Sequence, residues 1–203
     1  MQKTAHILSI IFSPMLLPVY GVAAALWLSL LVYLPLGTRL ATLTVVFIMT
    51  CVIPAGGVLL LRQLGVVRDI GLNNRDERTA PYLITGVCYL GCMIYLIKVN
   101  APSWLVMFMA GAALAVAVCV TVNLKWKISG HMTAMGGLIA ILCRIAVNGS
   151  AAVNMFWPII IAVVLTGMVG TARILLDRHT LLQVIAGTAN GFICVYLMSA
   201  ITY

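Results

Sequence analysis

Charge is scarce in this sequence, and acidic residues are the scarcest of all. The 203 residues include four Asp and Glu against 12 Lys and Arg, and together these make up 8% of the chain. No polar stretch is long enough to link two separate domains, so we expect one integral domain over residues 1–203. The apolar stretch that follows residues 1–6 lacks a small-residue cleavage site, which argues against a removable signal peptide.

The net charge of +8 does not come from one dense basic patch. The cations are scattered through short loops between apolar runs, and this distribution disfavours nucleic acid as a partner. Anionic lipid head groups or a phosphorylated substrate explain the cations better. We therefore expect membrane lipids and a phosphorylated lipid substrate as the partners of this chain.

The six cysteines all fall within apolar runs, at Cys51, Cys88, Cys92, Cys119, Cys143 and Cys194. Cys88 and Cys92 share a helix face, but no His or carboxylate accompanies them, so the expected role is that of small buried hydrophobic residues. We predict neither a disulfide nor a metal site, and we expect no cofactor.

Apolar residues make up 64% of the chain, and the mean hydropathy is +1.16. Runs of about 18 or more apolar residues recur, which is typical of membrane-spanning helices. Seven segments can be drawn, roughly over residues 15–35, 42–61, 81–98, 103–122, 132–147, 155–172 and 181–200. The predicted fold class is therefore all-α, a polytopic membrane helix bundle with six or seven transmembrane segments. Within the last segment, Gly187 and Gly191 have the spacing that lets two helices pack closely.

Four polar stretches fall on one side of the membrane if these segments alternate across it: the N-terminus and residues 62–80, 123–131 and 173–180. This side carries all four acids and nine of the 12 cations, whereas Arg39, Lys98 and Arg144 belong to the other side. The excess of cations favours a cytoplasmic location for the first side. Cations that bind phosphate do not report on topology, however, so the count leaves the orientation open.

Two of these polar stretches interrupt apolar runs with a histidine and several cations, at residues 125–131 and 172–183. A membrane protein keeps such groups only where protein, water or a charged ligand satisfies them. Arginine offers a planar fork that matches phosphate oxygens, so a cationic cup for a phosphate is expected. Its candidate members are Arg75, Arg78, Lys127 and Arg173, whereas Lys125 and Arg178 are expected to be solvated or lipid-facing.

The same stretches also hold groups suited to acid–base and nucleophilic chemistry. If Ser129 and Gly130 open a helix, their amides offer unpaired N–H donors to an anion, and glycine allows close approach of the backbone. Of His131 and His179, one can attack phosphorus while the other protonates the leaving oxygen.

The residues around the two histidines resemble the motifs of the type 2 phosphatidic acid phosphatase (PAP2) superfamily of membrane lipid phosphatases. Its second motif, P-S-G-H, is similar to Ile128-Ser129-Gly130-His131, and its third, S-R-x5-H-x3-D, is similar to Ala172-Arg173-x5-His179-x3-Gln183. Its first, K-x6-R-P, is degraded: Arg68-x6-Arg75 has the spacing with Asp76 in place of Pro, and Arg75-x2-Arg78-x2-Pro81 has cations in another register. A subgroup of short bacterial relatives is similar in this last pattern and in the glutamine. The resemblance covers about residues 62–191.

This resemblance implies a PAP2/haloperoxidase-like helical core over about residues 62–200. It implies that His179 is the nucleophile, which forms a phosphohistidine, and that His131 is the general acid toward the leaving alcohol. The groups that would hold the phosphoryl oxygens are Arg173, Arg75 or Arg78, and the backbone of Ser129 and Gly130, with Lys127 as a neighbour and no metal.

Gln183 stands where the family has a carboxylate that orients the nucleophilic imidazole. Gln183 follows His179 by four residues and can accept a hydrogen bond from Nδ1–H, although a neutral acceptor is weaker than a charged one by about half. If the amide turned and donated instead, it would favour the wrong tautomer. The sequence therefore leaves the level of catalytic activity open.

The resemblance implies a phosphoric ester hydrolase that cleaves a lipid phosphomonoester or pyrophosphate in the bacterial inner membrane, with its site at the periplasmic face. The lipid would reach the cup laterally, so its tail is expected to stay in the bilayer. Two alternatives remain: a catalytically degenerate protein that binds or transports lipid phosphates, and a phosphotransferase that uses another lipid alcohol as acceptor.

Overall fold

The computed structural model describes residues 2–68 and 76–201, and the regular elements within them are helices. Short turns at Leu30–Tyr33 (η1) and Asp76–Arg78 (η3) are 3-10 helical, and a π-helical turn at Ile48–Val52 (η2) joins α3 to α4. In chain order the α-helices are α1 (Gln2–Ile11), α2 (Leu17–Leu28), α3 (Leu36–Phe47), α4 (Ile53–Gln63), α5 (Thr79–Lys98), α6 (Ser103–Asn123), α7 (Gly130–Val147), α8 (Phe156–Leu175) and α9 (Leu181–Ser199).

Six helices among the described residues are long and apolar enough to cross a membrane. The first is the continuous run Leu36–Gln63, which contains α3, η2 and α4, and the others are α5 to α9. A helix of about 20 residues is roughly 30 Å long, which matches the hydrocarbon thickness of a bilayer. The predicted all-α polytopic membrane bundle is therefore confirmed.

The first predicted segment, residues 15–35, is not one spanning helix. It holds the 12 residues of α2 and the turn η1, and residues 12–16 break the chain between α1 and α2. Twelve residues rise only about 18 Å, less than a bilayer requires. Pro14 lies within this break and Pro18 is the second residue of α2, and their missing N–H groups prevent a continuous hydrogen-bond ladder from α1 into α2.

Carbonyl groups near this break accept hydrogen bonds from side chains of other elements. The Tyr89 hydroxyl on α5 donates to the Pro14 carbonyl at 3.1 Å, and Sγ of Cys51 in η2 donates to the Met15 carbonyl at 2.9 Å. Tyr20 on α2 donates to the Ile11 carbonyl at 3.0 Å. An irregular backbone is tolerated at membrane depth when neighbouring helices satisfy its polar groups, as they do here.

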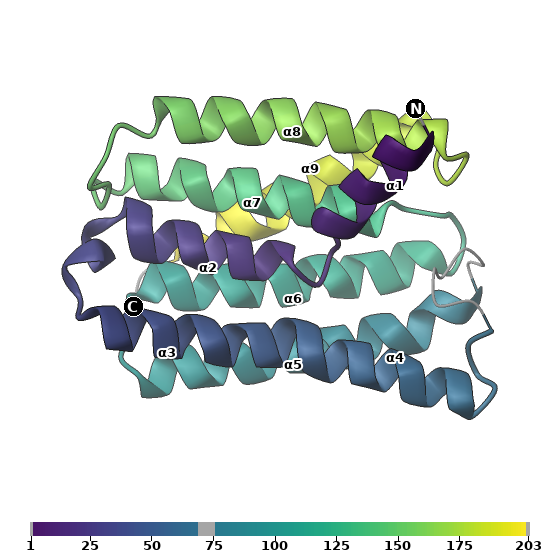
Figure 1. Ribbon diagram of the computed structural model, residues 1–203, viewed down its shortest axis with the longest axis horizontal. Helices are drawn as coiled ribbons and strands as arrows, with labels where there is room; N and C mark the ends of the chain where they lie inside the picture. The colour runs from purple at the N-terminus through teal and green to yellow at the C-terminus, as the bar shows by residue number, and fades with distance from the viewer. Residues whose placement is uncertain (1, 69–75, 202–203) are drawn as a thin grey trace.

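The long helices lie roughly alongside one another, so the polar connections gather at the two ends of the bundle (Figure 1). The N-terminus, the start of α5 and the α6–α7 and α8–α9 connections lie at one end, on the right in Figure 1. The α2–α3, α5–α6 and α7–α8 connections lie at the other end. The described parts of the four polar stretches thus lie at one end of the bundle, as the alternation of segments predicted, and we call this the site end.

Glycines let α9 approach α7 closely. A Cβ atom added to Gly191 would collide with the Thr133 carbonyl on α7, and one added to Gly187 would lie 2.6 Å from the Ser129 carbonyl. The predicted packing role of these two glycines is confirmed. It also fixes the start of α7 against α9 at the site end.

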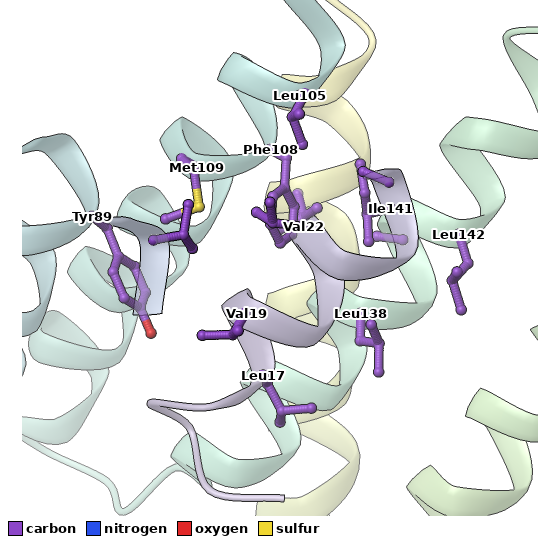
Figure 2. Packing of buried hydrophobic residues seen from close by; sticks show 14 of the residues in the cluster. Leu17, Val19, Val22, Tyr89, Leu105, Phe108, Met109, Leu138, Ile141 and Leu142 are labelled. Carbon is purple, nitrogen blue, oxygen red and sulfur yellow. The ribbon is translucent and has the colours of Figure 1, made fainter. Parts of the chain in front are cut away.

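The buried core continues on the other face of α7. Figure 2 shows residues of α2 between Tyr89 on one side and Leu138 and Ile141 of α7 on the other. Arg144, which we expected to snorkel or to find a partner, is buried on α7; its Nη2 donates to the Tyr196 carbonyl at 3.1 Å and its guanidinium covers the Tyr196 ring.

Candidate functional site

A cavity of about 660 Å³ opens among α1, α2 and α4 to α7, and α8 and α9 add Arg173 and Val195 to its lining. Most of its lining is apolar, but polar groups line the end that lies at the site end of the bundle. These groups are His6, Ser9, Arg78, His131, Arg173, Arg178 and His179. With Gly130, which also lines the cavity, five of the predicted site residues are brought together from distant parts of the chain: Arg78, Gly130, His131, Arg173 and His179.

His179 lies between α8 and α9, outside both helices, although its spacing of four residues from Gln183 is that of two residues on one face of a helix. Its Nδ1 lies 3.1 Å from Oε1 of Gln183. The same oxygen accepts from the backbone N–H of Thr180 at 3.3 Å, and the Thr180 side chain accepts from the Gln183 N–H, which together form a capping box at the start of α9.

This cap determines the tautomer of His179. A backbone N–H only donates, so the Gln183 atom that faces Thr180 is the amide oxygen, and Nδ1 of His179 must donate to that same oxygen. The Nε2 lone pair is then unprotonated and available. The amide orientation that would favour the wrong tautomer is disfavoured because it would turn a second donor toward the Thr180 N–H.

The environment of His179 favours its neutral form. Burial lowers the pKa of His179 to about 3, the hydrogen bond that its Nδ1–H donates to Gln183 acts in the opposite direction, and the charges of Arg78, Arg173 and Lys127 lower the pKa further. The imidazole is therefore uncharged near neutral pH. A neutral ring with a free Nε2 lone pair is the form that a nucleophile requires.

His131 is the second residue of α7, and its Nε2 lies 3.0 Å from the backbone carbonyl of Ser9 on α1. A carbonyl only accepts, so Nε2 of His131 carries the proton. Nη1 of Arg173 lies 3.4 Å from the Ser9 hydroxyl. Ser9 thus contacts two predicted site residues, and the sequence motifs did not indicate it.

Ser9 could have been found from helical spacing. His6, Ser9 and Ser13 are three and four residues apart, and all three line the cavity. The same holds on α5, where Tyr82, Thr85 and Tyr89 follow Arg78 at helical intervals and line the opposite wall. Polar residues at such spacing in an otherwise apolar chain indicate an inward-facing polar stripe.

The cations at the polar end come from several elements. Arg78, only 5% exposed, donates from Nη1 to the Ile128 carbonyl at 3.3 Å. Arg173 is buried in the last turn of α8, and its Nε has no hydrogen-bond partner among the described residues. Arg178, which we expected to be solvated or lipid-facing, is half-buried and lines the cavity.

Lys127 is half-buried beside this group. Burial lowers the pKa of its ammonium group, and the charges of Arg78, Arg173 and Arg178 lower it further. These cations therefore destabilise one another, and an anion at the polar end of the cavity would offset that repulsion.

Ser129 and Gly130 open α7, as the sequence predicted. Gly130 lines the cavity, and a Cβ atom added there would lie 3.0 Å from the Tyr82 hydroxyl, so a side chain at this position would crowd Tyr82. The first amides of a helix lack partners within the helix and can bind an anion. Ser129 is fully buried behind Gly130, and its hydroxyl has no hydrogen-bond partner among the described residues.

Arg75, a predicted member of the cationic cup, lies outside the described residues. Glu77 accepts a hydrogen bond from the Arg68 N–H at 2.9 Å. In the part of the chain that the structure describes, no three His, Cys, Asp or Glu side chains come together as they would around a metal ion.

Comparisons with protein-family models, with curated proteins and with solved structures found no match to this chain. The chemistry of the site therefore has to be inferred from its own groups. They are a neutral imidazole with a free lone pair, a second imidazole with a proton on Nε2, and several cations at the mouth of an apolar cavity.

Proposed function

We propose that this protein is a lipid phosphatase that hydrolyses a lipid phosphomonoester or pyrophosphate through a phosphohistidine on His179. The observation that carries the proposal is the meeting of His131, His179 and Arg173 at the cationic end of an otherwise apolar cavity. The motif resemblance to the PAP2 superfamily supports the same reaction. An amphiphile with an anionic head group and an apolar tail has the polarity pattern of this cavity.

The proposed reaction has two steps. In the first, the Nε2 lone pair of His179 attacks phosphorus, the bond from phosphorus to the lipid oxygen breaks, and a protonated His131 donates its Nε2 proton to that oxygen. In the second, water attacks the phosphohistidine, His131 takes the proton of the water, the phosphorus–nitrogen bond breaks, and inorganic phosphate leaves. Arg78, Arg173, Lys127 and the first amides of α7 stabilise the phosphoryl oxygens throughout.

Substrate binding must change the site before the first step. The Ser9 carbonyl accepts from His131 at the position that the leaving oxygen would take, so the substrate has to displace it. The phosphate also brings negative charge to a group of cations, which favours a second proton on His131. Phosphate binding therefore supplies both the acceptor and the charge that the general acid requires.

We further propose that the protein resides in the bacterial inner membrane with its site end in the periplasm. The motive is the resemblance to bacterial phosphatases of this type. The arginines that line the cavity have a binding role, and this weakens the argument from cation counts for the opposite orientation.

The test is an assay of purified protein in detergent with phosphatidic acid, phosphatidylglycerol phosphate, undecaprenyl pyrophosphate and lipid A phosphate as separate substrates, by release of phosphate. We expect His179→Ala to abolish release and His131→Ala to lower it by about 10²- to 10⁴-fold, the usual contribution of a general acid. Arg173→Gln should also lose activity, whereas Arg39→Gln, at the far end of the bundle beside Trp27, is the matched control.

A phosphoprotein intermediate gives a second readout. The His131→Ala variant should retain radioactive phosphate from a labelled substrate in an acid-labile, base-stable linkage, and the double variant with His179→Ala should not. Phosphate release that persists unchanged in His179→Ala would reject the proposed nucleophile.

The second candidate is a protein that binds lipid phosphates without hydrolysis. The neutral Gln183 beside His179 favours it, because the positive charge of a phosphohistidine then lacks a carboxylate partner. Binding of the lipid phosphates by wild-type protein with no release of phosphate would support this candidate.

A further inference from the structure

The apolar part of the cavity extends far beyond the polar end. From Arg78 its wall follows α5 past Pro81 and Thr85 to Tyr89, and on α6 it runs from Cys119 past Ala112 to Phe108. Tyr89 lies 11 residues after Arg78, and Phe108 lies 11 residues before Cys119. At 1.5 Å per residue, both walls are about 16 Å long.

The far end of the cavity is closed by tightly packed side chains. Phe108 is 3% exposed, and its ring fills the space beside Gly21 on α2, where an added Cβ atom would lie 2.6 Å from it. Tyr89 is held by its hydrogen bond to the Pro14 carbonyl. Figure 2 shows the Phe108 ring near Val22 of α2, with the Tyr89 ring to the left of both. Both rings of this floor are buried against backbone, so moving either one would disturb the packing of the neighbouring element.

The remaining wall comes from α1, the break after it, α2 and α4, with Ile10, Leu17 and Val58 among its residues. These elements precede the region that carries the motif resemblance. They extend the apolar cavity beyond the helices that carry the motif resemblance.

We propose that this cavity holds the hydrocarbon chain of the substrate and limits its length to about 12 carbons. The inference rests on the proposed function for the identity of the head group. A carbon–carbon bond of about 1.5 Å at its normal angle advances an extended chain by about 1.3 Å, so a depth of about 16 Å accommodates about 12 carbons. The ligand class is thus a phosphate ester of a medium-length chain, straight or methyl-branched. Of the lipids named for the phosphatase assay, undecaprenyl pyrophosphate is therefore not expected to be cleaved, because its chain is much longer than the cavity.

Selection by length must come from exclusion at the floor. Bilayer tails are as apolar as the cavity lining, so extra methylene groups gain little by entering the protein. A chain longer than the cavity must instead bend or displace Phe108 and Tyr89, which are packed against α2 and the break. We therefore expect turnover and binding to be highest at one chain length. A site at the bilayer surface would instead give values that increase steadily with chain length.

The experiment uses n-alkyl monophosphates with 8 to 16 carbons and farnesyl monophosphate, each at a fixed mole fraction in one detergent. Phosphate release measures turnover, and the shift in thermal unfolding temperature caused by the corresponding alkyl phosphonates measures binding without turnover. In wild type we expect both to peak at about 12 carbons and kcat/KM to fall at least tenfold by 16 carbons. The branched substrate shows whether the cavity prefers a methyl-branched chain.

Two variants change the depth of the cavity, and a third variant is the control. Ala112→Phe places a ring seven residues along α6 from Cys119, about 10 Å from the polar end, and should move the optimum to about eight carbons. Phe108→Ala should move it to longer chains. Leu114→Phe adds the same ring on the exposed face of α6 and should leave the profile unchanged.

The outcomes separate this inference from the proposed function. Hydrolysis with a flat chain-length profile that Ala112→Phe does not alter overturns the chain cavity and leaves the phosphatase intact. Phosphonate binding that follows chain length without hydrolysis of any substrate supports the cavity and rejects the phosphatase. Flat binding and no hydrolysis reject both.

Discussion

The orientation of the His179 imidazole depends on an amide, Gln183, that is itself held by a helix cap. Oε1 of Gln183 accepts from both Nδ1 of His179 and the backbone N–H of Thr180, so the amide cannot turn without losing the cap. The glutamine therefore fixes the tautomer that leaves Nε2 free. What it does not supply is the negative charge that would stabilise an imidazolium.

The change Gln183→Glu tests this division of roles, because it keeps the reach of the side chain and the cap while adding the charge. In wild type the pKa of His179 is lowered to about 3, so the ring stays neutral as the pH falls through 6.5. A carboxylate at hydrogen-bond distance should raise the pKa of His179 by about one to three units and increase turnover through a stabilised phosphohistidine. Nitrogen-15 NMR of histidine-labelled protein measures the titration directly.

Assignment of the NMR signals is simple because the chain has three histidines, so His6→Gln and His131→Gln identify the signal of His179. Gln183→Met is the matched neutral control, which removes the acceptor and should lower turnover without raising the pKa. A wild-type His179 that titrates near 6.5 would contradict the burial and the charges described here. A wild type with no turnover that becomes active as Gln183→Glu would favour the binding protein over the phosphatase.

The contact between α7 and α9 brings the two histidine segments together. His131 begins α7 and His179 immediately precedes α9, and Gly187 and Gly191 let these helices approach until backbone meets backbone. The contact therefore supports both the stability of the bundle and the geometry of the site. A larger residue in it should affect both.

We predict that Gly191→Ala destabilises the protein, because its methyl group would collide with the Thr133 carbonyl on α7. Overpacking of this kind costs about 1–3 kcal/mol, since the backbone of two helices has to shift. Gly167→Ala on α8 is the matched control, because an added Cβ atom there meets nothing within 4 Å, and it should be neutral or stabilising by up to about 1 kcal/mol. Thermal unfolding in detergent measures both, and equal unfolding temperatures for the two variants would refute the close contact.

The sequence predicted the parts of the fold that local patterns encode. The start of α7 at Gly130 and the close packing of Gly187 and Gly191 follow from helix-start residues and from the spacing of small residues. The side assignment of the polar stretches follows from the alternation of apolar segments. Each of these features depends on residues that are neighbours in the chain or in one helix.

The sequence did not predict the break between α1 and α2 or the role of Ser9. By hydropathy, residues 15–35 form one apolar run. The break is not visible in that pattern, because the donors that stabilise it, Tyr89 and Cys51, come from distant elements. Ser9 reaches His131 only because α1 folds back over the site end, and no motif encodes that contact. The cavity was missed for the same reason, since eight of the α-helices contribute residues to its lining.

For the orientation of the whole molecule, only cations without a role in the cavity should be counted. The site end carries nine cations, but Arg78, Arg173 and Arg178 line the cavity, and Lys127 interacts with them. Without these and the phosphate-binding candidate Arg75, four remain at the site end, Lys3, Arg62, Arg68 and Lys125, against three at the far end. A difference of one does not determine topology, so the positive-inside rule no longer opposes a periplasmic site.

A periplasmic site end requires a cytoplasmic C-terminus, because the N-terminus lies at the site end and the C-terminus lies at the opposite end (Figure 1). Green fluorescent protein fused after Tyr203 should therefore fluoresce, and alkaline phosphatase fused there should be inactive. In intact cells a membrane-impermeant maleimide should label Asp177→Cys, which is exposed at the site end, and not Ala152→Cys, which is exposed at the far end; the six native cysteines set the background. Labelling of Ala152→Cys alone would place the site in the cytoplasm, and labelling of both positions would contradict the arrangement of the bundle itself, since the two connections would then share one face of the membrane.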